Sequence, residues 1–225
     1  MTNFKNFKYI MINTFKKKSL NRILQEIFAK NKNASGKIAE FGAQHKSTKN
    51  FVNFINIKSA SEVLFCDKFP KDSETSKHDL EVKLSFEDET FDNIIVFNVL
   101  EHVYDIKNAF SEINRCLKKD SSLIGSTPFI HRVHGAPDDF NRYTKQFIER
   151  VLLETNFKNI KVENFGYGPF TAAYTLVFDY LKFIPFLNNL LLAVSMTFDG
   201  LINKIIKTKT HNIYPVTICF SGEKK

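Results

Sequence analysis

The chain has 225 residues, 43% of them hydrophobic, which is enough to bury one sizeable core. Its formal net charge is +8, yet residues 1–37 carry nine Lys/Arg and one acidic residue, so the remainder is formally neutral. A neutral body argues against nucleic acid as a partner, because phosphate binding needs clustered basic charge.

The first 36 residues have the pattern of a basic, amphipathic helical extension. Apolar residues recur at helical spacing between Phe4 and Phe15 and again between Leu20 and Ile27. We expect helices that cap the body with a solvated charged face; the alternative is a helix lying on an anionic membrane surface. A signal peptide is not expected, because lysines leave only a short uncharged run in this segment.

Residues 37–225 alternate short apolar runs with helical patterns, which predicts one layered α/β domain with a largely parallel sheet. Strands are expected at 37–41, 62–67, 93–100, 122–127, 159–165 and 212–220. Helices are expected at 48–56, from the N-cap Asp105 through Leu117, and from the N-cap Thr144 to Asn156, which tolerates the left-handed conformation.

An apolar insertion, residues 170–208, precedes the last expected strand. It holds sixteen residues without a charge, FIPFLNNLLLAVSMTF, interrupted by Pro185 and two Asn. This run is too short and too interrupted to predict a transmembrane helix. We expect a helical pair that covers the sheet edge or a homodimer face; the alternative is an interfacial element near a lipid-linked substrate.

Three strand ends carry residues suited to a nucleoside-containing cofactor, because ligands of open α/β sheets bind at the carboxyl ends of strands. Glu40 and Gly42 follow the first strand, and Asp67 ends the second, near the position from which an acid holds ribose hydroxyls. The third strand end is formed by Asn98 to His102, at the end of the strand expected at 93–100. The chain lacks GxGxxG, which argues against a nicotinamide dinucleotide, because pyrophosphate needs close backbone approach. A cofactor without phosphates, such as S-adenosylmethionine, tolerates this loss better.

Two stretches, FDNIIVFNVLEHVYDIKNAFSEINRCLKKDSSLIGSTPF and HGAPDDFNRYTKQFIERVLLETNF, resemble class I S-adenosylmethionine-dependent methyltransferases of the small-molecule type. The resemblance is closest to a bacterial branch associated with cell-surface polysaccharide clusters, and it covers residues 37–165. It implies a Rossmann-like seven-stranded sheet with helices on both faces and an antiparallel last strand. It also implies cofactor-binding roles for Glu40, Gly42, Ala43, Asp67, Asp79, Leu80, Asn98, Val99 and Leu100.

The segment HGAPDDFNRYT would then face the acceptor substrate, because it follows the fifth strand. Methyl transfer is an in-line displacement in which alignment dominates and a base helps a hydroxyl nucleophile. We expect His134 to be that base, oriented by Asp139, with His102 as the second candidate. Arg142 and Tyr143 would bind the acceptor, but Arg142 can equally pair with Asp139 while Tyr143 packs beneath the loop.

The expected function is therefore methyl transfer to a small or carbohydrate-like acceptor, with a hydroxyl as nucleophile. The alternative is a non-catalytic binding or membrane-surface module, because Gln44 and Lys46 stand where the family has glycines and could fill the cofactor loop. Cys66, Cys116 and Cys219 show no pairing pattern, and no metal site is expected. These features predict a cytoplasmic protein, with peripheral contact at the inner face of the membrane as the alternative.

Overall fold

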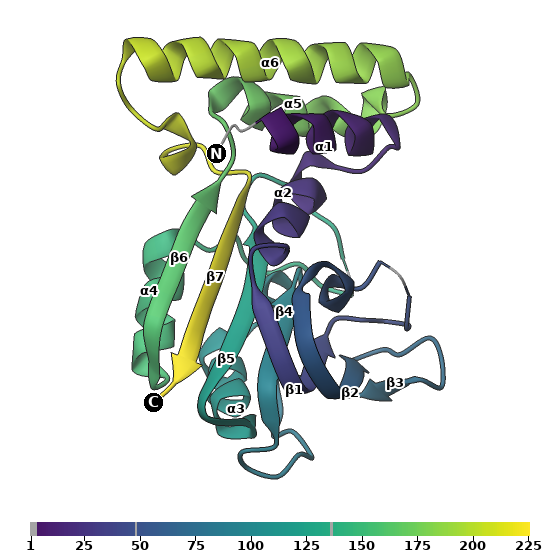
Figure 1. Cartoon of the computed structure of the whole chain (residues 1–225), viewed down its shortest axis with the longest axis vertical. Coiled ribbons are helices and arrows are strands. Elements are labelled where there is room, and N and C mark those ends of the chain that lie inside the picture. The colour runs from purple at the N-terminus through teal and green to yellow at the C-terminus, as the bar shows by residue number, and fades with distance from the viewer. Residues whose placement is uncertain (1–3, 48, 136) are drawn as a thin grey trace. The chain divides into compact units, whose positions relative to one another are not determined.

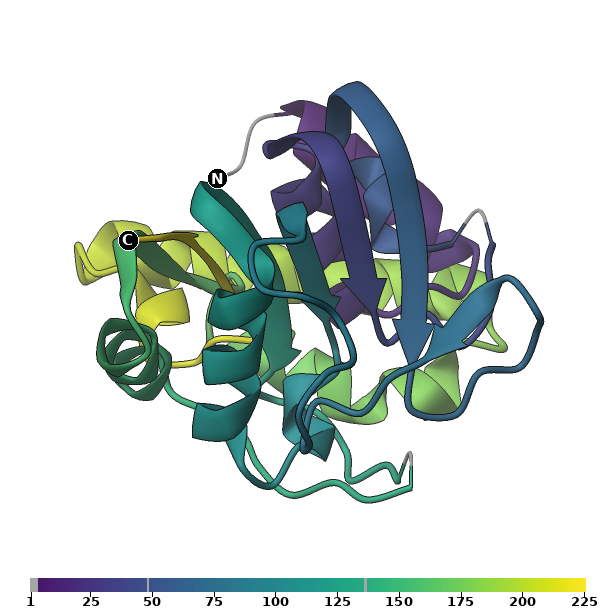
Figure 2. The same ribbon diagram turned by 90° about the horizontal axis from the view of Figure 1, so that it is seen from below.

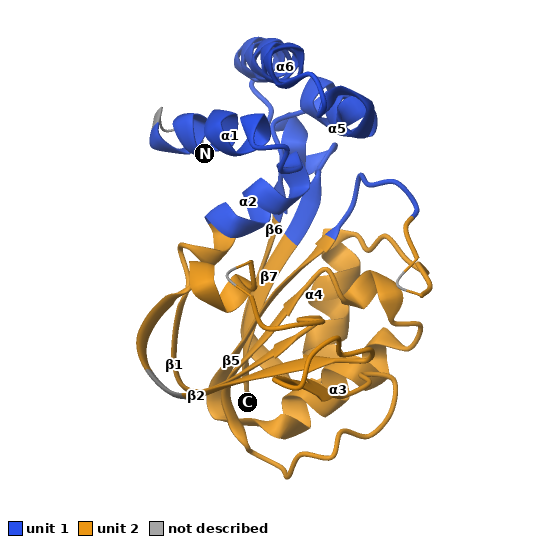
Figure 3. Ribbon diagram, turned by 90° about the vertical axis from the view of Figure 1, so that its right-hand side faces the viewer, with its two compact units in different colours: residues 1–27, 128–133, 164–218 blue, residues 28–127, 134–163, 219–225 orange. Residues whose placement is uncertain are grey.

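The computed structural model describes residues 4–47, 49–135 and 137–225. The chain forms two compact units, which Figure 3 draws in different colours. Unit 1 comprises residues 1–27, 128–133 and 164–218, and unit 2 comprises residues 28–127, 134–163 and 219–225. Each unit therefore draws on segments that are distant in the sequence.

A seven-stranded sheet has the strand order β3-β2-β1-β4-β5-β7-β6 (Figure 1). Strand pairs from β3 to β5 are parallel. The Lys224 Nζ, at the end of β7, donates to the Leu117 carbonyl at the start of β5, so β7 runs antiparallel to β5. The predicted Rossmann-like, mostly parallel sheet is confirmed. Its strands are β1 (Asn33–Phe41), β2 (Asn56–Asp67), β3 (Thr75–Lys77), β4 (Phe91–Phe97), β5 (Leu117–Pro128), β6 (Phe157–Phe165) and β7 (Thr217–Lys224).

The observed strand boundaries differ from the predicted ones for local reasons. β4 stops at Phe97, because Asn98 adopts a positive φ of 54° and turns the chain, so residues 98–100 are not strand as predicted. β7 begins at Thr217, two residues after Pro215, rather than at residue 212, where a short 3-10 helix lies instead (Thr210–Asn212). β1 and β2 begin earlier than predicted, at Asn33 and Asn56, and pair from there to Phe41 and Cys66 with two register shifts.

Two helices of unit 2 form where their N-caps predict them. The Asp105 carboxylate accepts the Asn108 N–H at the start of α3 (Ile106–Cys116). The Thr144 hydroxyl accepts the Phe147 N–H at the start of α4 (Lys145–Glu154). Figure 2 shows α3 and α4 on one face of the sheet. The ring of Phe110 on α3 packs edge-on against Phe157 of β6 and Phe220 of β7.

The helix predicted at 48–56 is wrong; a single 3-10 turn, Phe51–Phe54, takes its place, and Thr48 lies outside the described residues. The flanking residues Asn50 and Ile55 are both extended, which limits the turn to four residues. The Phe51 ring stacks on Phe97 of β4, with ring centroids 3.9 Å apart. This turn therefore covers part of the sheet with an aromatic contact rather than with a long helix.

Unit 1 holds most of α2 (Leu20–Ala29) together with α1 (Phe4–Phe15), α5 (Pro169–Leu181) and α6 (Pro185–Ile205). The predicted helical pair of the insertion is confirmed as α5 and α6. Pro185 starts α6 instead of interrupting it, because a proline at the first helical position loses no hydrogen bond. The 21-residue α6 is thus longer than the sequence pattern suggested, and by length and composition it could cross a membrane.

Candidate active site

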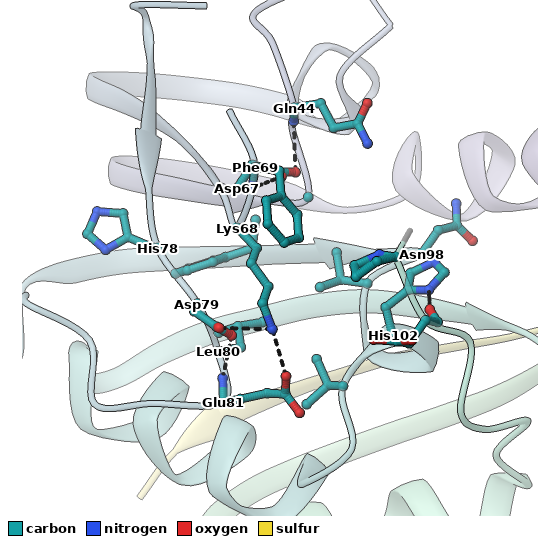
Figure 4. Close-up of a pocket in the computed structure, with 16 residues that line it drawn as sticks. Gln44, Asp67, Lys68, Phe69, His78, Asp79, Leu80, Glu81, Asn98 and His102 are labelled. Carbon is teal, nitrogen blue, oxygen red and sulfur yellow. Dashed lines mark hydrogen bonds and ion pairs between the residues drawn. The ribbon is translucent and has the colours of Figure 1, made fainter. Parts of the chain in front are cut away.

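A cavity of about 360 Å³ lies in unit 2 at the carboxyl ends of β1, β2 and β4. The sheet order reverses between β1 and β4, so the cavity occupies the position where open α/β sheets bind ligands. Figure 4 shows the side chains that surround it. The lining residues are Phe41, Gly42, Gln44, Asp67, Lys68, Phe69, His78, Asp79, Leu80, Glu81, Asn98, Val99, His102, Val103, Pro137 and Asp138.

Gly42 directly follows β1 and has a positive φ of 81°, at which a side chain would be strained. A Cβ atom on this residue would lie 2.3 Å from Cγ2 of Val99, which follows β4. The two strand ends can approach this closely only because residue 42 is glycine. The resulting narrow floor of the cavity is consistent with the predicted cofactor role of Gly42 and Val99.

Asp67 ties the loop after β1 to the end of β2. Its Oδ2 accepts the Gln44 N–H at 3.0 Å, and its Oδ1 accepts the Phe69 N–H at 2.7 Å. Each carboxylate oxygen can accept a second hydrogen bond, so Asp67 retains capacity for two ligand hydroxyls. Its position in the cavity therefore suits the predicted contact with a ribose.

The two residues that fill the cofactor loop under the alternative, non-catalytic hypothesis leave the cavity open. The Lys46 side chain forms an ion pair with Glu74 and does not line the cavity. Gln44 does line it, but its Oε1 accepts a hydrogen bond from the Lys71 Nζ, and Figure 4 shows the side chain directed away from Asp67. The side chains of Gln44 and Lys46, which replace glycines of the family, thus do not fill the space beside Gly42.

The far end of the cavity combines an apolar wall with an ion-pair network. Leu80 is buried, while the Lys68 ammonium lies 2.9 Å from both Asp79 Oδ2 and Glu81 Oε2 (Figure 4). These hydrogen bonds raise the Lys68 pKa, so the amine stays protonated. Asp79 and Leu80 line the cavity as expected for an adenine contact.

Three of the predicted cofactor residues do not line the cavity. Both oxygens of Glu40 are held by the N–H groups of Phe51 and Val52, at 2.7 and 2.9 Å, so this buried carboxylate caps the 3-10 turn. Ala43 and Leu100 are buried and do not line the cavity. These hydrogen bonds give Glu40 a structural role, and its predicted contact with the cofactor stays a prediction.

A second group of polar side chains lies beside the cavity, and His102 belongs to both. The His102 Nδ1–H donates to the Asp138 carbonyl at 2.5 Å, which leaves the lone pair on Nε2, 3.9 Å from Glu101 Oε1. The rings of His102 and His134 meet edge to face, with centroids 4.9 Å apart. The two predicted base candidates are thus neighbours.

Asp139 organises the loop that carries His134. Its carboxylate accepts two hydrogen bonds from the Arg142 guanidinium, at 2.5 and 2.7 Å, and the His134 backbone N–H at 2.8 Å. The His134 Nδ1 lies 3.3 Å from the same carboxylate. The Arg142 hydrogen bonds hold the pKa of Asp139 far below its ordinary value. Asp139 therefore contacts both His134 and Arg142, and its role in orienting a catalytic base stays a prediction.

Tyr143 lies beneath this loop rather than in the cavity. Its hydroxyl donates to the carbonyls of Leu100 and Val103, each at 3.3 Å, and its ring stacks on Phe147. Burial raises the Tyr143 pKa to about 12. These contacts agree with the alternative that Tyr143 packs beneath the loop, rather than with the predicted contact with the acceptor.

Glu101 is a site residue that the sequence analysis did not single out, as are the cavity-lining residues Lys68, Phe69 and Glu81. Its side chain is fully buried, and burial raises its pKa to about 8. Thr127 Oγ1 donates weakly to Oε2 at 3.5 Å, while Oε1 has no hydrogen-bond partner within the described residues. The signal available in the sequence was an acid placed directly after a strongly apolar strand.

The structure also groups residues that the sequence did not reveal as a set. One donor atom each from Glu101, His102 and His134 lie within 4.8 Å of one another, close enough to share a proton or a divalent cation. The sequence predicted no metal site because His134 stands 32 positions from His102. The fold, not the local spacing, brings these three side chains together.

Comparison with known proteins supports the predicted methyltransferase fold. Residues 42–125 match the family described as a methyltransferase domain. A search of curated proteins gives no significant sequence match. Among solved structures, phosphoethanolamine N-methyltransferase 2 of Haemonchus contortus, in complex with phosphomonomethylethanolamine and S-adenosylhomocysteine, superposes with a TM-score of 0.52 at 15% identity. The same enzyme in complex with S-adenosyl-L-methionine gives 0.53 at 17% identity.

These two matches cover 91% of this chain but 52% of the Haemonchus contortus chains, so this chain spans about half of their length. An S-adenosylmethionine-dependent methyltransferase from Archaeoglobus fulgidus has a TM-score of 0.53 at 15% identity, covering 91% of this chain and 93% of its own. At such identities the likeness concerns the fold. The predicted class I methyltransferase fold is confirmed.

Proposed function

We propose that this chain, whose residues 42–125 match the methyltransferase-domain family, transfers a methyl group from S-adenosylmethionine to a small-molecule acceptor. The observation that carries the proposal is the cavity at the reversal of strand order, where Gly42, Asp67, Asp79 and Asn98 meet. The structural neighbours bind this cofactor or its demethylated product.

The cavity residues fit the chemical parts of an adenosyl cofactor. Asp67 offers carboxylate oxygens to ribose hydroxyls, Leu80 and Phe69 offer apolar surface to a purine, and Gly42 gives close backbone approach. When bound, the cofactor supplies an electrophilic methyl group on a sulfonium. Side chains of this protein would bind and orient the acceptor and accept its proton.

We further propose that the acceptor is a neutral hydroxyl on a small, carbohydrate-like molecule. His134, oriented by Asp139, would accept the hydroxyl proton, with the adjacent His102 as the alternative base. Both terminal nitrogens of the Arg142 guanidinium donate to Asp139, which favours a neutral acceptor over a phosphate or carboxylate.

Calorimetric titration of the whole chain with S-adenosylhomocysteine tests the proposal. We expect binding with a dissociation constant below about 1 mM, since substrates and cofactors commonly bind in that range. Asp67→Asn should weaken binding about tenfold or more, because it removes charge-assisted acceptors for the ribose. Asp120→Asn is the matched control, since Asp120 is exposed and pairs with Lys158 outside the cavity. Absence of binding at millimolar ligand would reject the proposed function.

A further inference from the structure

The helices α5 and α6 of unit 1 expose a large set of apolar side chains. Over the most apolar 18-residue stretch of α6, mean hydropathy is 1.3 and only 28% of the residues are buried. Tyr180, Phe183, Phe186 and Ile205 are between 68% and 81% exposed. Monomeric soluble proteins rarely leave contiguous apolar patches of this kind, so the surface calls for an occupant.

Unit 1 also contains the whole net positive charge of the protein. It has eleven Lys/Arg and three Asp/Glu, a formal charge of +8, while unit 2 is neutral. Each acid of unit 1 is engaged internally. Glu26 pairs with Lys18 and Arg22, Asp179 pairs with Lys182 and Arg132, and the buried Asp199 accepts the N–H groups at the start of α5. The solvent-facing charge of unit 1 is therefore positive.

Lysines and apolar side chains lie side by side on this unit. The Asn189 side chain of α6 donates to the Met11 carbonyl of α1 at 2.8 Å, which joins the basic first helix to the apolar pair. The Lys17 Nζ lies 5.4 Å from the centroid of the Phe183 ring. Lys16, Lys17 and Lys204 are exposed. Apolar side chains flanked by lysines are typical of helices that lie on a membrane surface.

We propose that unit 1 binds the surface of an anionic lipid bilayer. The exposed side chains of α5 and α6 enter the boundary between headgroups and acyl chains, and the lysines contact lipid phosphates. A second copy of the chain is a poorer occupant, because each copy would bring a net charge of +8 to the same contact. This inference concerns unit 1 and does not depend on the proposed methyl transfer.

The helix α6 lies along the surface rather than across the bilayer in this proposal. Asn188 and Asp199 of α6 are fully buried and hydrogen-bonded to the neighbouring α5 segment. The Tyr174 hydroxyl donates to Asn188 at 2.8 Å, and Asp199 accepts three hydrogen bonds from Phe170 and Thr171. A spanning helix would have to bring these polar groups into hydrocarbon, which is costly.

Vesicle co-sedimentation of the full chain tests the inference, with neutral phosphatidylcholine vesicles and with vesicles that also contain phosphatidylglycerol. We expect binding to the anionic vesicles to be at least about tenfold stronger and to weaken with added salt. The double variant Phe183→Glu, Phe186→Glu should lose about tenfold or more of this binding. Its matched control is Leu153→Glu, an exposed helical leucine of unit 2.

A charge variant completes the experiment. Lys16→Glu with Lys17→Glu should lower binding to anionic vesicles, whereas Lys58→Glu with Lys77→Glu, the same change on exposed lysines of unit 2, should leave it unchanged. Equal binding to both vesicle types, or full binding by the phenylalanine variant, would overturn the proposal. A concentration-dependent dimer, abolished by the phenylalanine variant in the absence of any vesicle binding, would assign the face to a second copy instead. Unchanged circular dichroism spectra and urea-unfolding midpoints in all variants would show that the fold is intact.

Discussion

Gly42→Ala should destabilise the protein and weaken cofactor binding together. A Cβ at this position carries a left-handed backbone penalty of roughly 1–2 kcal/mol, because φ is +81°. It also meets Val99 Cγ2 at 2.3 Å, and overpacking of this kind costs about 1–3 kcal/mol. The expected loss in the free energy of unfolding is therefore about 2–5 kcal/mol.

The two contributions can be separated by a double-mutant cycle with Val99→Ala. Removing the Val99 methyl groups relieves the steric contact but leaves the backbone penalty, so the second substitution should restore about 1–3 kcal/mol in the Gly42→Ala background. Urea unfolding followed by circular dichroism measures the free energies, and titration with S-adenosylhomocysteine measures the affinity. Wild-type stability and affinity for Gly42→Ala, or no recovery with Val99→Ala, would refute the close approach of the two strand ends.

Three further predictions concern the polar cluster beside the cavity. His134→Ala should lower turnover by roughly 10²-fold or more without changing cofactor affinity. The control is His45→Ala, at an exposed histidine that does not line the cavity, and it should have no effect. Equal turnover for both variants would show that His134 is not the base. Treatment with EDTA should leave turnover unchanged, because the proposed methyl transfer uses a histidine as base and needs no metal ion. A loss of turnover that a divalent cation reverses would instead identify Glu101, His102 and His134 as metal ligands. Burial raises the Glu101 pKa to about 8, so the folded protein favours the protonated carboxyl. The free energy of unfolding of wild type, relative to that of Glu101→Gln, should therefore fall as pH rises from about 4.5 to 8, by at most about 5 kcal/mol. A difference that stays constant with pH in parallel urea titrations would contradict the buried, protonated carboxyl.

The elements that the sequence predicted well are those whose pattern is set locally. Asp105 and Thr144 each cap a helix with their own side chain, and a run of apolar residues is enough to indicate the buried β4. The error at residues 48–56 has a non-local cause. The N–H groups of that turn are bound by Glu40, eleven and twelve residues earlier, and no periodicity in the segment reports such a partner.

The candidate site was predictable in part for the same reason. Strand ends mark where a ligand binds, so Gly42, Asp67 and Asn98 could be placed from the alternation of elements, whereas Asp79 was placed only by the family resemblance. The meeting of Glu101 with His134 could not, because it depends on how a loop returns over β4 and on the Asp139–Arg142 pair that shapes it. The separation between Tyr143 and the cavity likewise depends on which side of that loop the ring packs.

The hydrogen bonds from Gln44 and Phe69 to Asp67 have a thermodynamic consequence. A loop already fastened to the neighbouring strand has little freedom left to surrender when a ligand arrives, so association carries a small ordering cost. Gln44 keeps its positive φ of 34° through this fastening, without the permissive backbone that glycine would supply. The Asp67 carboxylate therefore fixes the conformation of this loop, which a glycine would otherwise have to permit. A search that recognises cofactor loops only by their glycines would miss chains of this kind.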